Sequence, residues 1–224
     1  MSPSEPRPPA PRTTPRYGGY VGLLALVILA LITLNTITTK PNGATGIAPG
    51  GQIPPFAVPL ALGSLTGDAD TARHADEGAA GRIPACRERG PQILNVCQLY
   101  EGAPMLLALF VDGGSCADVL GDMQALAPSF PGVRFAAVAI KGARAQVRTL
   151  IEKRGLTLPV GLDRDGALAA LYKVATCPQL TFVYPGGEVQ SKALLSRPSR
   201  ATLRARLAAL VVAARARGWK GPAR

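Results

Sequence analysis

The sequence has only one histidine, His74, and few aromatic residues, which make up 5% of the chain. A single histidine excludes a Ser/His/Asp catalytic site built on any other histidine. His74 has no carboxylate or cysteine at the spacing of a metal site, so no bound metal is expected. The chain also lacks zinc-finger spacing and a recognised RNA-binding signature, which argues against a nucleic-acid partner despite its net charge of +11.

Acidic residues are missing from the C-terminal part of the chain. None follows Glu188, whereas lysines and arginines continue to Arg224. The excess positive charge is therefore concentrated there, and we interpret it as a solvated helix face followed by a basic tail over residues 218–224. Contact of this face with anionic lipid is an open alternative.

Charged residues are also missing from positions 20–39, where the sequence is mostly Leu, Ile, Val and Ala. A helix of this length, at about 1.5 Å per residue, spans a hydrocarbon core of about 30 Å, so one transmembrane helix is predicted. The proline-rich residues 1–19 are predicted to form a disordered tail. Because arginines precede the apolar stretch, this tail is expected in the cytoplasm and the rest of the chain outside.

A cleaved signal peptide is the alternative interpretation of this segment. Residues 38–41 offer no small-x-small cleavage site, and the apolar stretch is longer than a usual signal peptide requires. The sequence therefore favours an anchor in the cell membrane.

The remaining residues predict a linker over residues 40–55, rich in glycine and proline, and one α/β domain over residues 56–217 with a mixed sheet. Continuous apolar runs at 105–111 and 133–140 indicate buried central strands. The other expected elements are an edge strand at 56–60, an exposed loop at 63–81, helices at 116–127, 143–154 and 166–172, a hairpin at 181–184 and 189–193, and a final helix with Leu203, Leu207, Leu210, Val211 and Ala214 on one face.

The turn Asp163-Arg164-Asp165-Gly166 superficially matches the start of a calcium-binding loop. Its glycine comes too early, however, and Val174 stands where the bidentate glutamate would be. The pattern therefore predicts a turn and a helix cap rather than a cation site.

The four cysteines lie in the part of the chain expected outside the cytoplasm, where disulfides persist. Four cysteines permit three pairings, and their spacing alone does not choose among them. Cys116 follows the first apolar strand, and Ser115 with Asp118 matches a capping box that would make Cys116 the first helical residue. The helix dipole would lower the pKa of this thiol, whereas Asp112 and Asp118 would raise it.

Cys177 directly precedes Pro178, which opens an apolar strand. Proline is tolerated mainly at the start of a strand, and X-Pro bonds are the ones that adopt the cis form at low cost, so this bond is a candidate cis peptide. The strand then ends at the turn Pro185-Gly186-Gly187, as expected for a hairpin.

These features together resemble the membrane-anchored thioredoxin-like proteins of the TlpA type, and more distantly the peroxiredoxins (the redoxin and AhpC-TSA families). The resemblance runs over about residues 51–217 and includes the stretches 158–166 and 172–174 before Cys177-Pro178. It implies a thioredoxin-like fold. These families usually carry Cys-x-x-Cys at the helix start, but here Val119 replaces the second cysteine, so the motif is degenerate.

The resemblance also implies that the residue before the proline lies beside the first active-site cysteine, so Cys116 and Cys177 could form a disulfide. This bond would be either a redox-active pair or a permanent staple. Cys86 and Cys97 flank a short loop before the central strand, and we expect a structural disulfide between them rather than a second redox couple.

The functional prediction is a thiol-disulfide oxidoreductase without a cofactor, acting on protein clients and on an unidentified redox partner. Cys116 would be the nucleophile and Cys177 the resolving thiol, with Thr176 and Pro178 shaping the substrate groove. The alternative is a disulfide-stapled binding domain, which Val119 favours. A peroxidase is less well supported, because Leu109 and Gly113 replace the proline and threonine of the peroxiredoxin motif.

Overall fold

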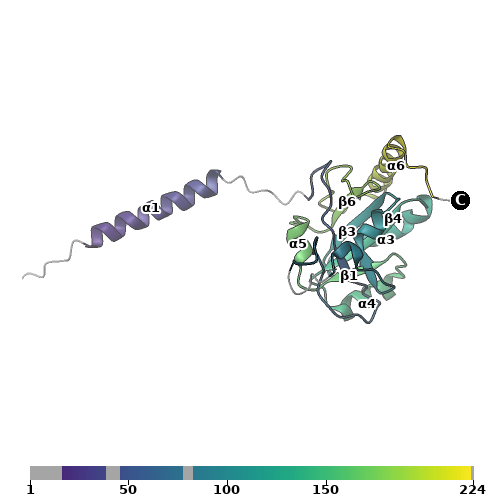
Figure 1. Cartoon of the computed structure of the whole chain (residues 1–224), viewed down its shortest axis with the longest axis horizontal. Helices are drawn as coiled ribbons and strands as arrows, with labels where there is room; N and C mark the ends of the chain where they lie inside the picture. Colours follow the sequence, from purple (N-terminus) through teal and green to yellow (C-terminus); the bar gives the residue numbers. More distant parts are fainter. Residues whose placement is uncertain (1–16, 39–45, 78–82, 223–224) are drawn as a thin grey trace, which may run out of the picture. The chain divides into compact units, whose positions relative to one another are not determined.

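The computed structural model describes residues 17–38, 46–77 and 83–222 (Figure 1). The contacts divide the chain into two units, residues 1–42 and 43–224. Most of the tail predicted over residues 1–19 lies outside the described residues, as do positions 40–45 of the predicted linker and the last two residues of the basic tail.

The first unit contains one helix, α1 (Tyr17–Thr38). The structure describes the side chains of positions 19–33 of this helix, and all of them are exposed. Among the residues that the structure describes, no helix combines the length and the apolarity that a membrane span requires.

The second unit is built around a four-stranded sheet in the order β5-β4-β3-β6 (Figure 1). Its strands are β3 (Met105–Phe110), β4 (Arg134–Ile140), β5 (Val160–Asp163) and β6 (Gln179–Val183). β3 and β4 are parallel, as are β4 and β5, whereas β6 runs antiparallel to β3. The sheet is therefore mixed, which confirms this part of the prediction.

Short elements surround this sheet. They are a two-stranded antiparallel pair β1 (Ala57–Pro59) and β2 (Ile93–Asn95), the 3-10 turns η1 (Ala85–Arg87) and η2 (Ala127–Ser129), and the helices α2 (Val96–Tyr100), α3 (Asp118–Leu126), α4 (Arg144–Arg154), α5 (Ala167–Leu171) and α6 (Arg200–Ala216). The second arm of the predicted hairpin is present only as isolated bridges, Val183 to Val189 and Leu180 to Leu194.

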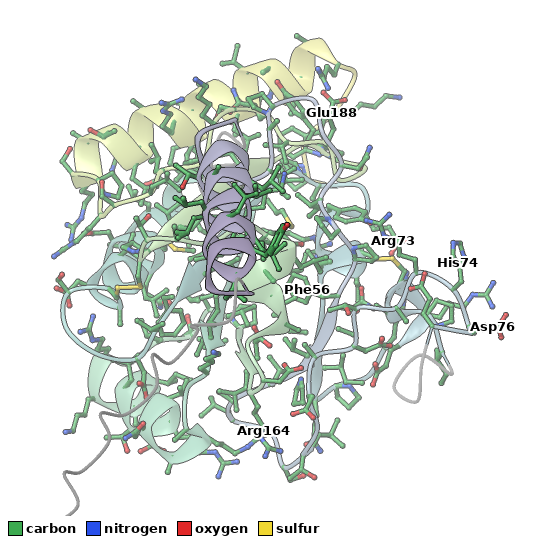
Figure 2. All side chains as sticks on the ribbon, turned by 90° about the vertical axis from the view of Figure 1, so that its left-hand side faces the viewer. Phe56, Arg73, His74, Asp76, Arg164 and Glu188 are labelled. Carbon is green, nitrogen blue, oxygen red and sulfur yellow. A yellow bond between two sulfur atoms is a disulfide. The ribbon has the colours of Figure 1, made fainter. Side chains whose placement is uncertain are left out.

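The loop expected at 63–81 is only partly exposed. Asp70 exchanges two backbone hydrogen bonds of 2.9 Å with Ala57, and Ala69 and Ala72 are buried. Arg73, His74 and Asp76 then project from one edge of the body (Figure 2). Residues 78–82 of this region lie outside the described residues. The predicted exposed loop therefore fails only at Ala69, Asp70 and Ala72 among the described positions, because the sequence contains no strand pattern that would reveal the pairing with Ala57.

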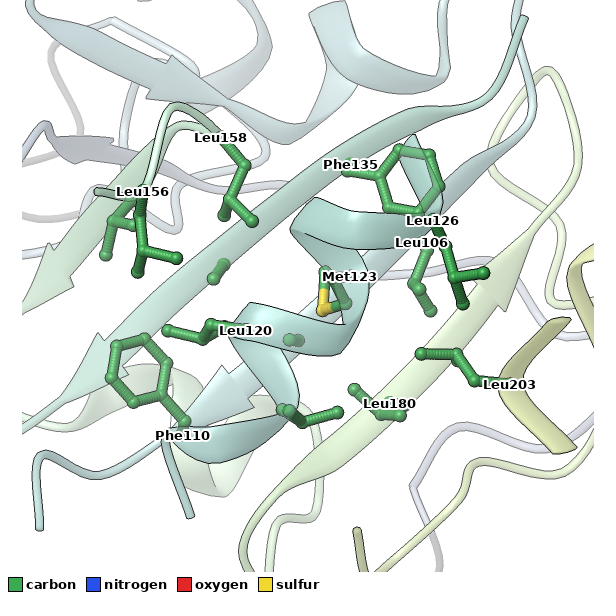
Figure 3. Close-up of a cluster of buried hydrophobic side chains, with 14 of the residues drawn as sticks. Leu106, Phe110, Leu120, Met123, Leu126, Phe135, Leu156, Leu158, Leu180 and Leu203 are labelled. Atoms are coloured by element: carbon green, nitrogen blue, oxygen red, sulfur yellow. The ribbon is translucent and has the colours of Figure 1, made fainter. Parts of the chain in front are cut away.

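The two faces of the sheet carry separate apolar clusters, because successive side chains of a strand point to opposite faces. Leu106, Ala108 and Phe110 of β3 pack on one face with α3, α4 and α6, as the close-up in Figure 3 shows for Leu106, Phe110, Leu120, Met123 and Leu203. Met105, Leu107 and Leu109 pack on the other face with β1, α2 and α5. The central strands are therefore buried on both sides, as their continuous apolar runs predict.

Two residues just after α6, Arg217 and Trp219, contact the rest of the domain. The Trp219 ring packs against the core, and its Nε1–H donates to the carbonyl of Gly102 at 3.1 Å. The Arg217 guanidinium lies 4.0 Å from the centre of the Tyr184 ring and 2.8 Å from a Glu188 carboxylate oxygen. Part of the C-terminal positive charge is thus paired within the domain.

Candidate functional site

The candidate site lies where the end of β3 meets the start of β6. The two strands are antiparallel neighbours, and Leu109 of β3 is paired with Gln179 of β6. Cys116 follows β3 after a short loop, and Cys177 precedes β6 by two residues. The antiparallel register therefore brings together two cysteines that are 61 residues apart in the sequence.

Cys116 and Cys177 form a disulfide with their Cα atoms 5.4 Å apart. Both residues are half-buried, and Cys177 also packs against the larger apolar cluster. The backbone N–H of Val111, which directly follows β3, donates to the Sγ of Cys177 at 3.2 Å. The Cys177–Pro178 bond, predicted as a candidate cis peptide, is cis.

The start of the neighbouring helix differs from the sequence expectation. α3 begins at Asp118 with Ala117 as the N-cap, and no side chain caps it. Ser115 is exposed and contributes only its carbonyl, which accepts from the Asp118 N–H at 3.2 Å. The predicted capping box is therefore wrong, and Cys116 lies in the turn before the helix rather than at its first position. Gly113 and Gly114, both at positive φ, start this turn.

The Asp118 side chain is unavailable as a cap because it is paired with arginines. Its two carboxylate oxygens lie 2.7 Å from Arg154 and 3.3 Å from Arg197. Arg154 also donates to the carbonyl of Ala117 at 2.8 Å, so one guanidinium holds both the N-cap residue and the first residue of α3. Charge pairing has replaced capping at this helix end.

The position that a second active-site cysteine would occupy is part of the core. Val119 is completely buried, and it packs in the cluster between α3 and the sheet. No free thiol is therefore available within α3 to attack a mixed disulfide on Cys116. Only Cys177 is placed to do so.

Beside Cys116, charged residues from three segments converge, and the sequence patterns did not identify this group. Asp122 of α3 is buried and accepts from Arg197 and Arg200, each at 3.0 Å. With Asp118 and Arg154 these residues form an acidic and basic cluster, which we call the charge cluster. Its members come from α3, from the C-terminal end of α4 and from the segment that leads into α6.

The two predicted substrate-groove residues flank Cys177 but differ in exposure. Pro178 is buried, whereas Thr176 is exposed. The Thr176 hydroxyl donates to the carbonyl of Leu195 at 2.6 Å. The structure therefore brings Thr176 and Pro178 to the disulfide, and it uses the Thr176 side chain in an internal contact.

The second disulfide joins Cys86 and Cys97, with their Cα atoms 5.3 Å apart. Asn95 is buried between them, and its amide donates to the carbonyls of Ala85 at 2.6 Å and Glu88 at 2.8 Å. Its oxygen accepts from the N–H of Gln98 at 3.2 Å and so caps α2. Burial raises the pKa of Glu88, and nearby Asp70 raises it further through repulsion and a hydrogen bond.

The turn at residues 163–166 has the predicted capping role. The buried carboxylate of Asp163 accepts from the N–H of Gly166 at 3.1 Å and of Leu168 at 3.0 Å, at the start of α5. Burial raises the pKa of Asp163 to about 6, helped by a hydrogen bond with Asp165 and by repulsion from it, and opposed by the two backbone donors. Among the described residues, no three His, Cys, Asp or Glu side chains lie close enough together to hold a metal ion.

Comparison with solved structures identifies the architecture. A putative thiol:disulfide interchange protein DsbE from Chlorobium tepidum superposes with a TM-score of 0.55 over 75% of this chain and 98% of that one, at 16% identity. A putative thioredoxin from Neisseria meningitidis gives 0.53 over 76% and 95%, at 15% identity. The chain has the thioredoxin-like fold. A thioredoxin family protein from Chlorobium tepidum agrees, with a TM-score of 0.54, 12% identity and coverage of 74% and 99%.

Sequence comparison finds a match to one curated protein. The thiol-disulfide oxidoreductase ResA of Oceanobacillus iheyensis is 36% identical over 59 residues, which are 26% of this chain and 31% of that protein. The chain thus covers less than a third of the length of this relative. No family model matches the chain.

Proposed function

We propose that this chain is a thiol-disulfide oxidoreductase that uses Cys116 and Cys177 as its redox pair. The proposal rests mainly on the disulfide between Cys116, in the loop after β3, and Cys177, the residue before the cis-proline. Their Cα atoms are 5.4 Å apart. The fold and the similarity to a ResA protein support the same assignment. The pair is half-buried at the surface, so a partner thiol can approach it.

In the proposed cycle, the Cys116 thiolate attacks one sulfur of a client disulfide, and the other client sulfur leaves as a thiolate. The Cys177 thiolate then attacks the Cys116 sulfur. The Cys116–Cys177 bond forms, the bond to the client breaks, and the client is released with both sulfurs reduced. Two electrons move from the protein to the client, and an external dithiol must return them. The opposite direction uses the same steps in reverse.

Cys177 is suited to the resolving role because a backbone amide points at its sulfur. The Val111 N–H, 3.2 Å from Sγ, stabilises negative charge on this atom whenever Cys177 is a thiolate. Cys116 has an exposed glycine-rich turn on one side, which leaves room for a client. The exposed backbone at Thr176 would pair with an extended client segment, and Pro178 would shape the groove beside it.

The test is a redox titration combined with turnover. The oxidised protein is equilibrated with glutathione or dithiothreitol buffers, and each cysteine pair is quantified by alkylation and mass spectrometry. We expect Cys116–Cys177 to titrate well above about −300 mV and the reduced protein to reduce a disulfide-linked peptide. A potential far below that value, with no turnover by the wild type, would refute the proposal.

The second candidate is a binding domain in which both disulfides are permanent. Val119 favours it, because a buried valine stands in place of the usual second cysteine. The substitution Cys116→Ser separates the two candidates. It abolishes turnover if the pair is redox-active, and it leaves client binding intact if the domain only binds.

For location, we propose a single-pass anchor in the cell membrane with the redox domain outside the cytoplasm. The support comes from the sequence: the absence of charge over residues 20–39 and the arginines that precede this stretch. Alkaline extraction of membranes and N-terminal sequencing of the mature protein test this. Release by carbonate, or a mature protein that begins after residue 40, would refute the anchor.

A further inference from the structure

Residues 194–199, which connect the hairpin to α6, touch the loop that carries Cys177 and the helix α3 that follows Cys116. On the Cys177 side, the Leu195 carbonyl accepts from the Thr176 hydroxyl at 2.6 Å. On the Cys116 side, Arg197 lies 3.3 Å from Asp118 and 3.0 Å from Asp122. The connecting segment is thus a non-covalent link between the Cys177 loop and α3, the helix that directly follows the Cys116 loop.

The connecting segment is itself fixed at both ends. Leu194 exchanges backbone hydrogen bonds of 2.8 Å and 3.0 Å with Leu180 of β6. At the other end, the Ser199 hydroxyl caps α6 by accepting from the Thr202 N–H at 3.1 Å, and Arg200 lies 3.0 Å from Asp122. The segment therefore rests on the sheet and on α6, so it can hold the cysteine loops in place.

These contacts use no atom of either cysteine, so they do not depend on the disulfide bond. When the bond is reduced, the covalent link is lost, and the contacts at Thr176 and Arg197 act together with the pairing of β3 and β6 to limit the separation of the two cysteines. A restraint on the dithiol state raises the effective concentration of one thiol at the other. It therefore favours closure of the disulfide.

We propose that Arg197 is a positioning residue that keeps the thiols of Cys116 and Cys177 close to each other in the reduced protein. The hydrogen bond between Thr176 and Leu195 holds the Cys177 side of the same arrangement. This proposal rests on the redox role assigned to the pair. The affected step is the attack of the Cys177 thiolate on Cys116 in a mixed disulfide. The Cys116–Cys177 bond forms, and the partner thiolate leaves.

A contact that stabilises the fold equally in both redox states cancels from the equilibrium between them. The informative readout is therefore the equilibrium constant of the Cys116–Cys177 pair with glutathione disulfide, in which two glutathiones are released for each disulfide formed. The full-length chain is equilibrated in glutathione buffers, quenched with acid and alkylated, and the pair is quantified by mass spectrometry.

We expect Arg197→Gln and Thr176→Val each to lower this equilibrium constant by about threefold to tenfold, the size of a partly exposed ion pair or hydrogen bond. Arg197→Lys recovers part of the loss, because an ammonium can pair with one carboxylate but cannot bridge both as a guanidinium does. Arg204→Gln is the matched control. It removes the same charge from the exposed face of α6 and leaves the connecting segment intact.

Equal constants for the wild type, Arg197→Gln and Thr176→Val would overturn the proposal, as would an equal loss in Arg204→Gln. The result is separable from the proposed function. If the wild type fails to turn over a peptide disulfide while the constants still differ, the oxidoreductase assignment fails and the positioning role stands. If turnover is present and the constants agree, the reverse holds.

Discussion

The two disulfides have nearly the same Cα separation, 5.3 Å and 5.4 Å, but they lie in opposite surroundings. Cys86–Cys97 closes a loop of 11 residues around the buried Asn95, and Cys97 is itself buried. Cys116–Cys177 joins half-buried loops 61 residues apart, beside a backbone donor and a cluster of charges. Cys86, Cys116 and Cys177 are all half-buried, so Cys97 is the one fully buried cysteine of the four, and we propose that its burial makes Cys86–Cys97 the structural bond and Cys116–Cys177 the redox pair.

The carboxylates near the two bonds sharpen this contrast. Near Cys86–Cys97, burial raises the pKa of Glu88, and repulsion by Asp70 and a hydrogen bond with it raise that pKa further. Asp118 and Asp122, beside Cys116, are paired with Arg154, Arg197 and Arg200. The bond that we propose as the redox pair therefore has nearby aspartates that are paired with arginines, whereas the bond that we propose as structural lies near an unfavourable acidic pair.

The largest expected difference between the two bonds is in their rates of reduction. With limiting dithiothreitol, we expect Cys116–Cys177 to open at least about 100-fold faster than Cys86–Cys97, since attack requires access to a sulfur and a leaving thiolate that can be stabilised. Differential alkylation over time, followed by peptide mapping, measures both rates. Equal rates, or faster opening of Cys86–Cys97, would remove the distinction drawn between them.

We expect that the disulfide closing the longer loop stabilises the protein less than the one closing the shorter loop, the opposite of what loop length alone predicts. Chain entropy alone assigns about 4 kcal/mol to a bond closing 61 residues and about 3 kcal/mol to one closing 11. A redox-active bond is less stabilising than its loop predicts, because its reduced state must be accessible. We therefore expect Cys86→Ala with Cys97→Ala to lower the unfolding free energy more than Cys116→Ala with Cys177→Ala. Urea unfolding of the oxidised proteins decides the order.

Removing the Asn95 side chain should weaken only one of the two bonds. Asn95→Ala deletes two hydrogen bonds to carbonyls and the cap of α2, which we expect to cost about 2 kcal/mol of stability. The Cys86–Cys97 bond should become easier to reduce, and the potential of Cys116–Cys177 should stay unchanged. A parallel shift of both potentials would show that the two regions are coupled.

The smallest expected effect is the pH response at Glu88. Its folded pKa is raised, so the native state favours the protonated form, and ionisation costs stability as the pH rises above 4.5, the ordinary pKa of a glutamate side chain. Glu88→Gln should therefore stabilise the protein at pH 7 by less than about 1 kcal/mol, and the gain should disappear below pH 4.5. Thermal unfolding at pH 4 and pH 7 measures this. A gain that persists in acid would assign the effect to packing.

The sequence identified the parts of the fold whose signal is local. The apolar runs at 105–111 and 133–140 became β3 and β4, because strands buried on both faces need continuous apolar residues. β2 and β5 have three and four residues and no such run, and pairing with neighbours defines them. β5 contains Gly161, which breaks the apolar run in the sequence. The structure requires glycine there because a Cβ would overlap the Val58 side chain.

At the site, the cysteine pair was accessible to reasoning because the resemblance places a pre-proline residue beside the helix start. The charge cluster was not, because its arginines lie 36 to 79 residues from the aspartates they bind. The capping prediction failed for the same reason. A local Ser-x-x-Asp pattern says nothing about a distant guanidinium that competes for the aspartate.

The pairing of β6 with β3 has a consequence for biogenesis. Successive residues of a strand face opposite sides, so a slip of β6 by one position against β3 would turn Cys177 away from Cys116. The native bond can then form only in chains whose central strands have already found their correct partners. Oxidation of this pair would record that the sheet has been assembled correctly.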